Sequence, residues 1–206
     1  MAWQILISTR PDPPVFLVIG GPNGSGKSSV YRDSFYRLEQ ISFWIINPDL
    51  LAARISASEN LDLRAANLQA VMRIEDWLES SIRTYQTVGV ETVLSTAKYC
   101  RLVTLAKSLG FKFWFFYVLL DDPQRNVERV RVRVEKGGHA VPEDRIVDRY
   151  AKSLAQMPWF LNEADRAWIF DNSGASPRLV GEKIGGTVGL VPSAPQVLVE
   201  ALTVRD

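Results

Sequence analysis

Eight consecutive residues of this chain form a pattern that could bind phosphate groups. The segment reads GPNGSGKS over residues 21–28 and fills every position of the P-loop pattern. Glycines let the backbone curl so that several N–H groups point inward at one phosphate. The segment therefore predicts a binding site for ATP, formed by Gly21, Pro22, Asn23, Gly24, Ser25, Gly26, Lys27, Ser28 and Ser29.

The side chains and the flanks of this segment support the same prediction. Lys27 brings a mobile positive charge to the β- and γ-phosphates, and the Ser28 hydroxyl is a suitable ligand for Mg²⁺. Residues 15–19 are apolar and predict a buried strand, while residues 27–39 predict a helix. Because the N-terminal end of a helix is positive, it favours bound phosphate. We therefore expect ATP and Mg²⁺ as cofactors.

A carboxylate follows a second apolar segment. Asp49 comes after residues 43–46 and the pair Asn47-Pro48. At the end of a strand beside the γ-phosphate, a carboxylate can accept the proton of a substrate hydroxyl. Asp is also a common N-cap, so Asp49 could instead begin the next helix.

A second carboxylate, Glu91, interrupts the apolar residues 88–94. Burying a carboxylate in a strand is costly unless a charge or a hydrogen-bond donor meets it. Mg²⁺, a water bound to it or a substrate hydroxyl would meet this need, and the alternative is a surface position on an edge strand. Ser95 and Thr96 could line the same substrate pocket or cap the next helix.

Arginines recur every four residues in the helix predicted over 123–135. Arg125, Arg129 and Arg133 share one face of this helix, whereas Arg131 falls beside acidic residues and suggests a solvated ion pair. A neighbouring face carries three valines that would pack on the core: Val127, Val130 and Val134.

A second cationic helix is predicted after Gly137-Gly138. Its cations share a face: Arg145, Arg149 and Lys152. Two cationic helices joined by a glycine hinge indicate a lid around residues 125–153, which would bring guanidinium groups to the transferred phosphoryl group. Alternatively, these cations pair with acidic neighbours on a solvated surface. His139, the single histidine, lies at the hinge and could touch substrate or close the lid.

Strand-like segments alternate with helical ones along the chain. Besides 15–19 and 43–46, strands are predicted over 88–94, 111–120 and 167–170. This order predicts an α/β fold, a P-loop kinase-like three-layer sandwich with a parallel sheet of about five strands and a helical lid. Ligands in such folds bind beyond the carboxyl ends of the strands.

Composition divides the chain into three parts. Prolines separate an N-terminal arm, residues 1–14, from a kinase domain, residues 15–184, and the Gly-, Pro- and Val-rich residues 185–206 predict a loosely determined C-terminal extension. Within the domain, the helix predicted over 61–84 has an apolar face that should be buried. Its members are Leu61, Ala65, Leu68, Met72 and Ile82, with Val71, Trp77 and Leu78 beside them.

The overall composition excludes several classes of protein. Of the 206 residues, 47% are hydrophobic and 23% are charged, and the formal net charge is +1. Without a basic run interleaved with aromatics, this balance predicts no nucleic-acid partner. No apolar run approaches the roughly 20 residues that cross a bilayer, which predicts no membrane span. The single cysteine, Cys100, fits a reducing cytoplasm.

Several motifs, taken in order, resemble the short zeta toxin-like kinases. They are the P-loop, Asn47-Pro48-Asp49, Glu91-Thr92, the pairs Arg129-Val130 and Arg133-Val134, the segment GGHAVP over 137–142, and Arg149-Tyr150. The likeness runs from about residue 15 to residue 173. The GGHxVP segment followed by an Arg-Tyr pair is its most specific part.

This resemblance implies a kinase that transfers the γ-phosphate of ATP to a hydroxyl of a nucleotide sugar such as UDP-N-acetylglucosamine, with an antitoxin protein as a partner. It implies one role for each of these residues: Lys27 for phosphates, Asp49 as base, Glu91 and Thr92 for substrate or Mg²⁺, Arg129 and Asn172 for ATP, and Arg133 and Arg149 for the transition state. Two alternatives stay open. One is a kinase for another nucleotide, nucleoside or antibiotic hydroxyl, and the other is a nucleotide-binding switch that transfers no phosphate.

Overall fold

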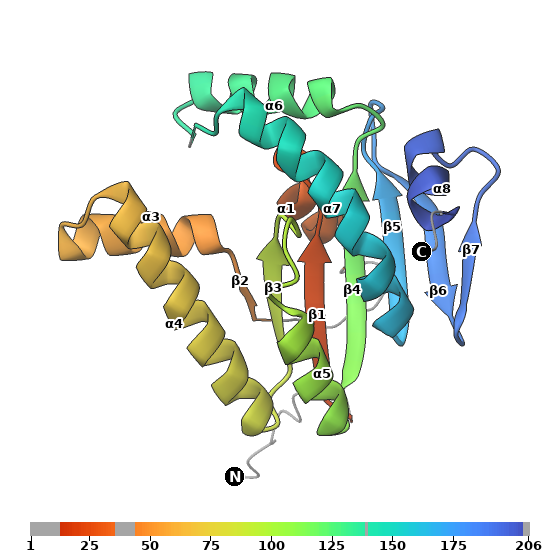
Figure 1. Ribbon diagram of the computed structural model, residues 1–206, viewed down its shortest axis with the longest axis horizontal. Helices are drawn as coiled ribbons and strands as arrows, with labels where there is room; N and C mark the ends of the chain where they lie inside the picture. Colours follow the sequence, from red (N-terminus) through yellow and green to blue (C-terminus); the bar gives the residue numbers. More distant parts are fainter. Residues whose placement is uncertain (1–12, 36–43, 139, 204–206) are drawn as a thin grey trace, which may run out of the picture.

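The computed structural model describes residues 13–35, 44–138 and 140–203, and its centre is a sheet of seven strands (Figure 1). The strand order is β2-β3-β1-β4-β5-β6-β7. In chain order these are β1 (Val15–Gly20), β2 (Ile45–Ile46), β3 (Val88–Thr92), β4 (Lys112–Leu119), β5 (Arg166–Asp171), β6 (Arg178–Ile184) and β7 (Thr187–Leu190).

The first five strands are parallel, which confirms the α/β fold with about five parallel strands predicted from the sequence. β1 and β4 lie at the centre and are buried almost throughout, as their continuous apolar runs indicate. The arrowheads of the parallel strands all point toward the helix that lies across the top of Figure 1. Residues that follow these strands are therefore gathered at one edge of the sheet.

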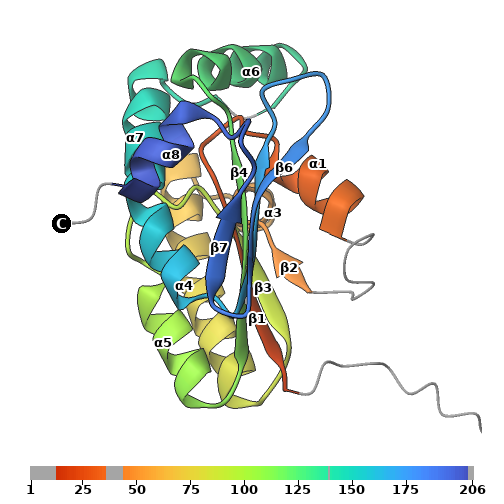
Figure 2. The same ribbon diagram turned by 90° about the vertical axis from the view of Figure 1, so that its right-hand side faces the viewer.

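Helices cover both faces of the sheet. They are α1 (Lys27–Val30), α3 (Pro48–Glu59), α4 (Leu63–Arg83), α5 (Cys100–Ser108), α6 (Pro123–Glu135), α7 (Glu143–Glu163) and α8 (Gln196–Thr203). Figure 2 shows α4, α5, α7 and α8 on one face and α1 on the other. The core between the sheet and the first group includes Ile74, Leu102 and Phe160, whereas Val30 of α1 packs on the opposite face.

The helix after the phosphate-binding segment changes its type after four residues. α1 ends at Val30 and continues as one turn of π-helix, η1 (Tyr31–Phe35). Residues 36–39 of the predicted helix and Phe43 lie outside the described residues. So do residues 1–12 of the N-terminal arm and His139.

The buried face of α4 agrees with the prediction at Leu78 and Ile82 but differs from it in the first half of the helix. Leu68 and Met72 are 62% and 53% exposed, whereas Ala66 and Ala70 are buried. The reason is that α3 packs on this part of α4 through Ala52 and other small or branched side chains. Small residues let two helices approach closely, and they therefore replace the larger residues at this contact.

The described residues after 184 form a strand, β7, and a helix, α8, rather than a loosely determined extension. β6 pairs antiparallel with β5, and β7 pairs antiparallel with β6. The boundary drawn after residue 184 thus falls inside a hairpin, between β6 and β7. Helix α8 follows and buries Leu198 in the same core as α7.

We expect the Leu198→Ala substitution to lower the free energy of unfolding by about 3 kcal/mol, because Leu198 is fully buried. Leu68→Ala is the matched control, since the same atoms are removed from a side chain that is mostly exposed, and its effect should stay within about 0.5 kcal/mol. Denaturant titration of both variants measures the difference. Equal losses would show that α8 does not pack on the core as described.

Within the described ranges, no helix combines the length and the apolar character that crossing a membrane requires.

Candidate functional site

The segment after β1 adopts a tight loop that ends at the first turn of α1. Gly24 and Gly26 have φ angles of 77° and 86°, in the left-handed region that favours glycine. A Cβ on Gly24 would lie 2.7 Å from the backbone oxygen of Asn126, and one on Gly26 would lie 2.5 Å from Nδ2 of Asn172. Both glycines are therefore required by backbone conformation and by space.

Lys27 lies buried at the centre of this loop. Its Nζ donates hydrogen bonds to the carbonyls of Gly21 and Pro22, at 2.7 and 2.9 Å. Burial lowers the pKa of Lys27, the nearby carboxylates of Glu91 and Asp49 oppose that change, and Arg133 adds to it. Glu91, Asp49 and Arg133 thus lie close enough to Lys27 to affect its pKa, although they come from three other elements.

Ser28 and Glu91 form a hydroxyl–carboxylate pair beside Lys27. The Ser28 hydroxyl lies 2.8 and 3.0 Å from the two carboxylate oxygens of Glu91. Oxygen ligands of this kind suit Mg²⁺, which usually takes its remaining ligands from phosphates and water. Among the described residues no group of three or more His, Cys, Asp or Glu side chains could hold a metal alone. The pair therefore fits Mg²⁺ bound together with a nucleotide.

Asp49 lies at the start of α3, and its carboxylate is exposed. The cap of this helix is Asn47, whose Oδ1 accepts hydrogen bonds from the backbone N–H groups of Asp49 and Leu50. N-capping of α3 was the alternative role for Asp49, and Asn47 fills that role instead.

The residues after Glu91 differ in what they contact. The Thr92 hydroxyl accepts a hydrogen bond from the backbone N–H of Leu94, which has a φ angle of 60°. Thr92 thus shapes the turn at the end of β3. Ser95 is partly buried, and neither it nor Thr96 caps α5, because that helix begins at Cys100 with Tyr99 before it.

The arginines of α6 do not act as one group. Arg129 donates to the backbone carbonyl of Asn172 at 2.7 Å, and Arg133 lies near Lys27. Arg125 instead pairs with Asp121 and donates to the carbonyl of Ser173 at the outer edge. Two of the three arginines expected to converge on phosphate therefore approach the loop, and the first does not.

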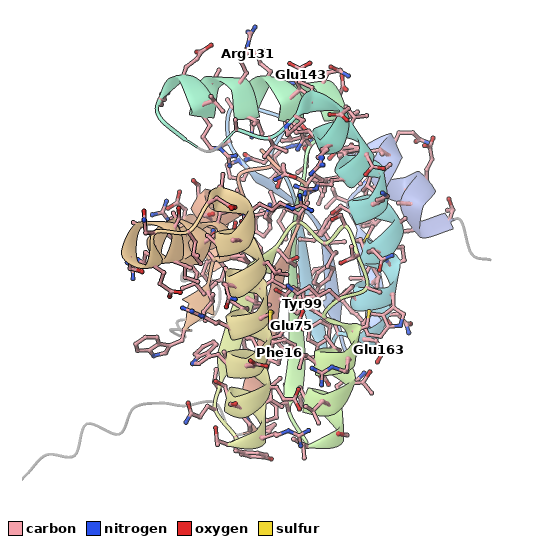
Figure 3. The ribbon with its side chains drawn as sticks, turned by 60° about the vertical axis from the view of Figure 1, so that its left-hand side comes forward. Phe16, Glu75, Tyr99, Arg131, Glu143 and Glu163 are labelled. Carbon is pink, nitrogen blue, oxygen red and sulfur yellow. The ribbon has the colours of Figure 1, made fainter. Side chains whose placement is uncertain are left out.

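The remaining cations of this region are mostly solvated. Arg131 pairs with Glu128 at 2.8 Å, as the sequence predicts, and Figure 3 shows it on the outer side of α6. Lys152 pairs with Asp148 at 2.8 Å, which agrees with the alternative of a solvated surface. Arg149 is partly buried on α7, and in the described part of the chain no hydrogen bond or ion pair joins it to the loop.

The valines of α6 are also placed differently from the prediction. Val130 is buried, but Val134 is 37% exposed and Val127 only partly covered. The second fully buried residue of the helix is Asn126, whose Nδ2 donates to the carbonyl of Asn23 at 2.6 Å.

Two side-chain amides therefore contact the loop from outside it. Asn172 follows β5 and donates from Nδ2 to the carbonyl of Ser25 at 2.8 Å. The sequence reasoning noted Asn172 near ATP and missed Asn126. A signal was present, since Asn126 lies one helical turn before Val130 and so shares its face.

A family model described as AAA domain (AAA_33) matches residues 16–156. An uncharacterized protein of Haemophilus influenzae is 28% identical over 130 residues, which cover 63% of this chain and 88% of that protein.

Two solved structures share the fold. A chain of the AvrRxo1-ORF1:AvrRxo1-ORF2 crystal structure with sulphate ions has a TM-score of 0.70 and 16% identity, and the match covers 94% of this chain and 66% of that chain. A chain of the PezAT chromosomal toxin–antitoxin system of Streptococcus pneumoniae has a TM-score of 0.67 and 18% identity, with 98% and 83% covered. The present chain thus spans slightly less than two thirds of the length of the AvrRxo1-ORF1:AvrRxo1-ORF2 chain.

Proposed function

Since the chain belongs to the AAA domain family (AAA_33), we propose that it is an ATP- and Mg²⁺-dependent kinase that phosphorylates a hydroxyl of a small molecule. The observation that carries this proposal is the presence of three charged side chains near Lys27 of the phosphate loop. Lys27 is within electrostatic reach of Glu91, Asp49 and Arg133. Phosphoryl transfer depends on such positioning of charge around the outer phosphate.

Each residue of this group has a separate role in the proposed reaction. Lys27 and the loop N–H groups bind the phosphates of ATP, and Ser28 with Glu91 would hold Mg²⁺, which would supply positive charge to the phosphates. Asp49 accepts the proton of the substrate hydroxyl. As that oxygen bonds to the γ-phosphorus, the bond from the γ-phosphorus to the bridging oxygen breaks and ADP leaves. Arg133 stabilises the charge that spreads over the phosphoryl oxygens.

For the acceptor we propose a nucleotide sugar such as UDP-N-acetylglucosamine. The support is the resemblance of the motifs to zeta toxin-like kinases, together with the shared fold of a chain from the PezAT toxin–antitoxin system. The same support suggests an antitoxin protein as a partner. Arg149 belongs to the proposal as a residue that reaches the phosphoryl group when the lid around residues 125–153 closes.

An incubation of the protein with labelled ATP, Mg²⁺ and a panel of acceptors tests this proposal. The panel contains nucleotide sugars, nucleosides, dinucleotides and aminoglycosides, and labelled product is separated from ATP. Label in a nucleotide sugar is the expected result. Label in another acceptor would keep the kinase and replace the substrate, whereas ATP binding with no labelled acceptor would favour a nucleotide-binding switch.

We expect Glu91→Gln to raise the Mg²⁺ concentration needed for half-maximal activity by about tenfold, because a charged oxygen near the ion is lost. Glutamine still accepts a hydrogen bond from Ser28, so the loop should keep its shape. Glu59→Gln is a matched control that removes a carboxylate paired with Arg73 on the surface. A titration of Mg²⁺ at saturating ATP measures the effect, and an unchanged midpoint would exclude Glu91 from the metal site.

A further inference from the structure

Two asparagines outside the phosphate loop hold alternate carbonyls of that loop. Asn126 donates from its Nδ2 to the oxygen of Asn23 at 2.6 Å, and Asn172 donates from its Nδ2 to the oxygen of Ser25 at 2.8 Å. Asn126 is fully buried on α6, and Asn172 directly follows β5. The loop is therefore restrained from two elements that are distant in sequence.

These two bonds determine where the next N–H groups point. In a planar trans peptide, the C=O group and the following N–H group point in opposite directions. When the carbonyls of Asn23 and Ser25 are drawn outward to the two amides, the N–H groups of Gly24 and Gly26 must point the other way. Neither N–H donates a hydrogen bond to any residue in the ranges that the structure describes.

Close packing keeps the peptides in this orientation. The Cα of Gly24 faces the backbone of Asn126, and that of Gly26 faces the Asn172 amide, so closely that a Cβ would have to displace them. Asn172 is itself held, because its backbone carbonyl accepts a hydrogen bond from Arg129 at 2.7 Å. A loop supported on both sides loses less conformational entropy when a ligand binds.

We propose that Asn126 and Asn172 are positioning residues that preset the loop, so that the N–H groups of Gly24 and Gly26 face the phosphate chain of the nucleotide. This inference rests on the proposed nucleotide binding. It assigns the Asn172 amide to the loop and not to the adenine base. It also assigns Asn126 on α6 to the fixed surroundings of the loop. The ligand recognised is the phosphate chain itself.

The test compares Asn126→Ala and Asn172→Ala with Asn67→Ala. Asn67 is the matched control because its Nδ2 also donates to a backbone carbonyl, that of Leu63 on the exposed side of α4. The dissociation constants of ATP and of inorganic tripolyphosphate, both with Mg²⁺, are measured by calorimetry. Thermal unfolding of each variant ensures that the measurements are made well below its melting temperature.

We expect each loop variant to raise both dissociation constants by about five- to tenfold, and by the same factor for the two ligands. Asn67→Ala should leave both unchanged. If Asn172→Ala weakens ATP but not tripolyphosphate, its amide contacts the base and the inference is wrong for that residue. Unchanged constants in both variants would overturn it entirely. A wild-type protein that binds neither ligand would instead refute the proposed function.

Discussion

Replacing Asp49 by Asn should reduce turnover by a factor of about 10² to 10⁴ while the dissociation constant of ATP changes less than threefold. The carboxylate is exposed at the start of α3 and lies close enough to Lys27 to affect its pKa. Asparagine keeps the shape of the side chain but cannot accept the hydroxyl proton. Steady-state kinetics with the acceptor found in the panel, together with calorimetric titration of ATP, separates the two quantities.

The control for Asp49→Asn must account for the charge lost near a helix N-terminus. Asp144→Asn is matched, because Asp144 also lies in the first turn of its helix, α7. We expect both variants to lose a similar stability, about 0.3 to 1 kcal/mol, from the weaker interaction with the helix dipole. If Asp49→Asn kept at least a third of the wild-type turnover, Asp49 would not be the base.

The phosphate loop could be predicted from sequence because its conformation is encoded locally. Gly24 and Gly26 need positive φ angles and free space, and their spacing from Lys27 is a feature of the sequence itself. The parallel strands could be predicted equally well from the sequence, since strands buried on both faces are continuous apolar runs. Such signals do not depend on which distant element packs on the segment.

Residues that depend on tertiary contacts were harder to predict. Hydrophobic periodicity favoured Leu68 and Met72 as the buried face of α4, but the contact with α3 uses alanines, so the larger side chains are exposed. Asn126 was missed for a related reason. A polar residue lowers the apparent hydrophobicity of the face it occupies, and its partner, the carbonyl of Asn23, is far away in the sequence.

The hairpin formed by β6 and β7 could have been predicted from two adjacent glycines, but the overall composition of the segment suggested otherwise. Gly185 and Gly186 have φ angles of 60° and 90° and join β6 to β7. Two glycines between short runs of strand-forming residues are typical of a tight β-turn that needs positive φ at both positions. The high Gly, Pro and Val content of residues 185–206 suggested a loose segment. The position of the two glycines between strand-forming residues was the better predictor of structure.

Substitution of Lys27 by Met should abolish function without lowering the stability of the fold. Met has a similar length and fits a buried site, but it carries no charge to the phosphates. We expect the dissociation constant of ATP to rise by about a hundredfold, as the loss of a charge-assisted hydrogen bond implies, and turnover to become undetectable. Lys112→Met is the matched control. Lys112 is exposed and pairs with Asp165 at the start of β4, the end of the strand away from the phosphate loop.

The stability of the ligand-free Lys27→Met variant tests the same electrostatic argument. Burial lowers the pKa of Lys27, which means that the folded state disfavours its charged form relative to the unfolded chain. Near neutral pH, removing the charge should therefore leave the melting temperature unchanged or raise it, even though two carbonyls lose their donor. A variant that binds ATP normally would refute the phosphate role of Lys27. A clearly lower melting temperature would instead show that its hydrogen bonds to Gly21 and Pro22 outweigh the cost of burying its charge.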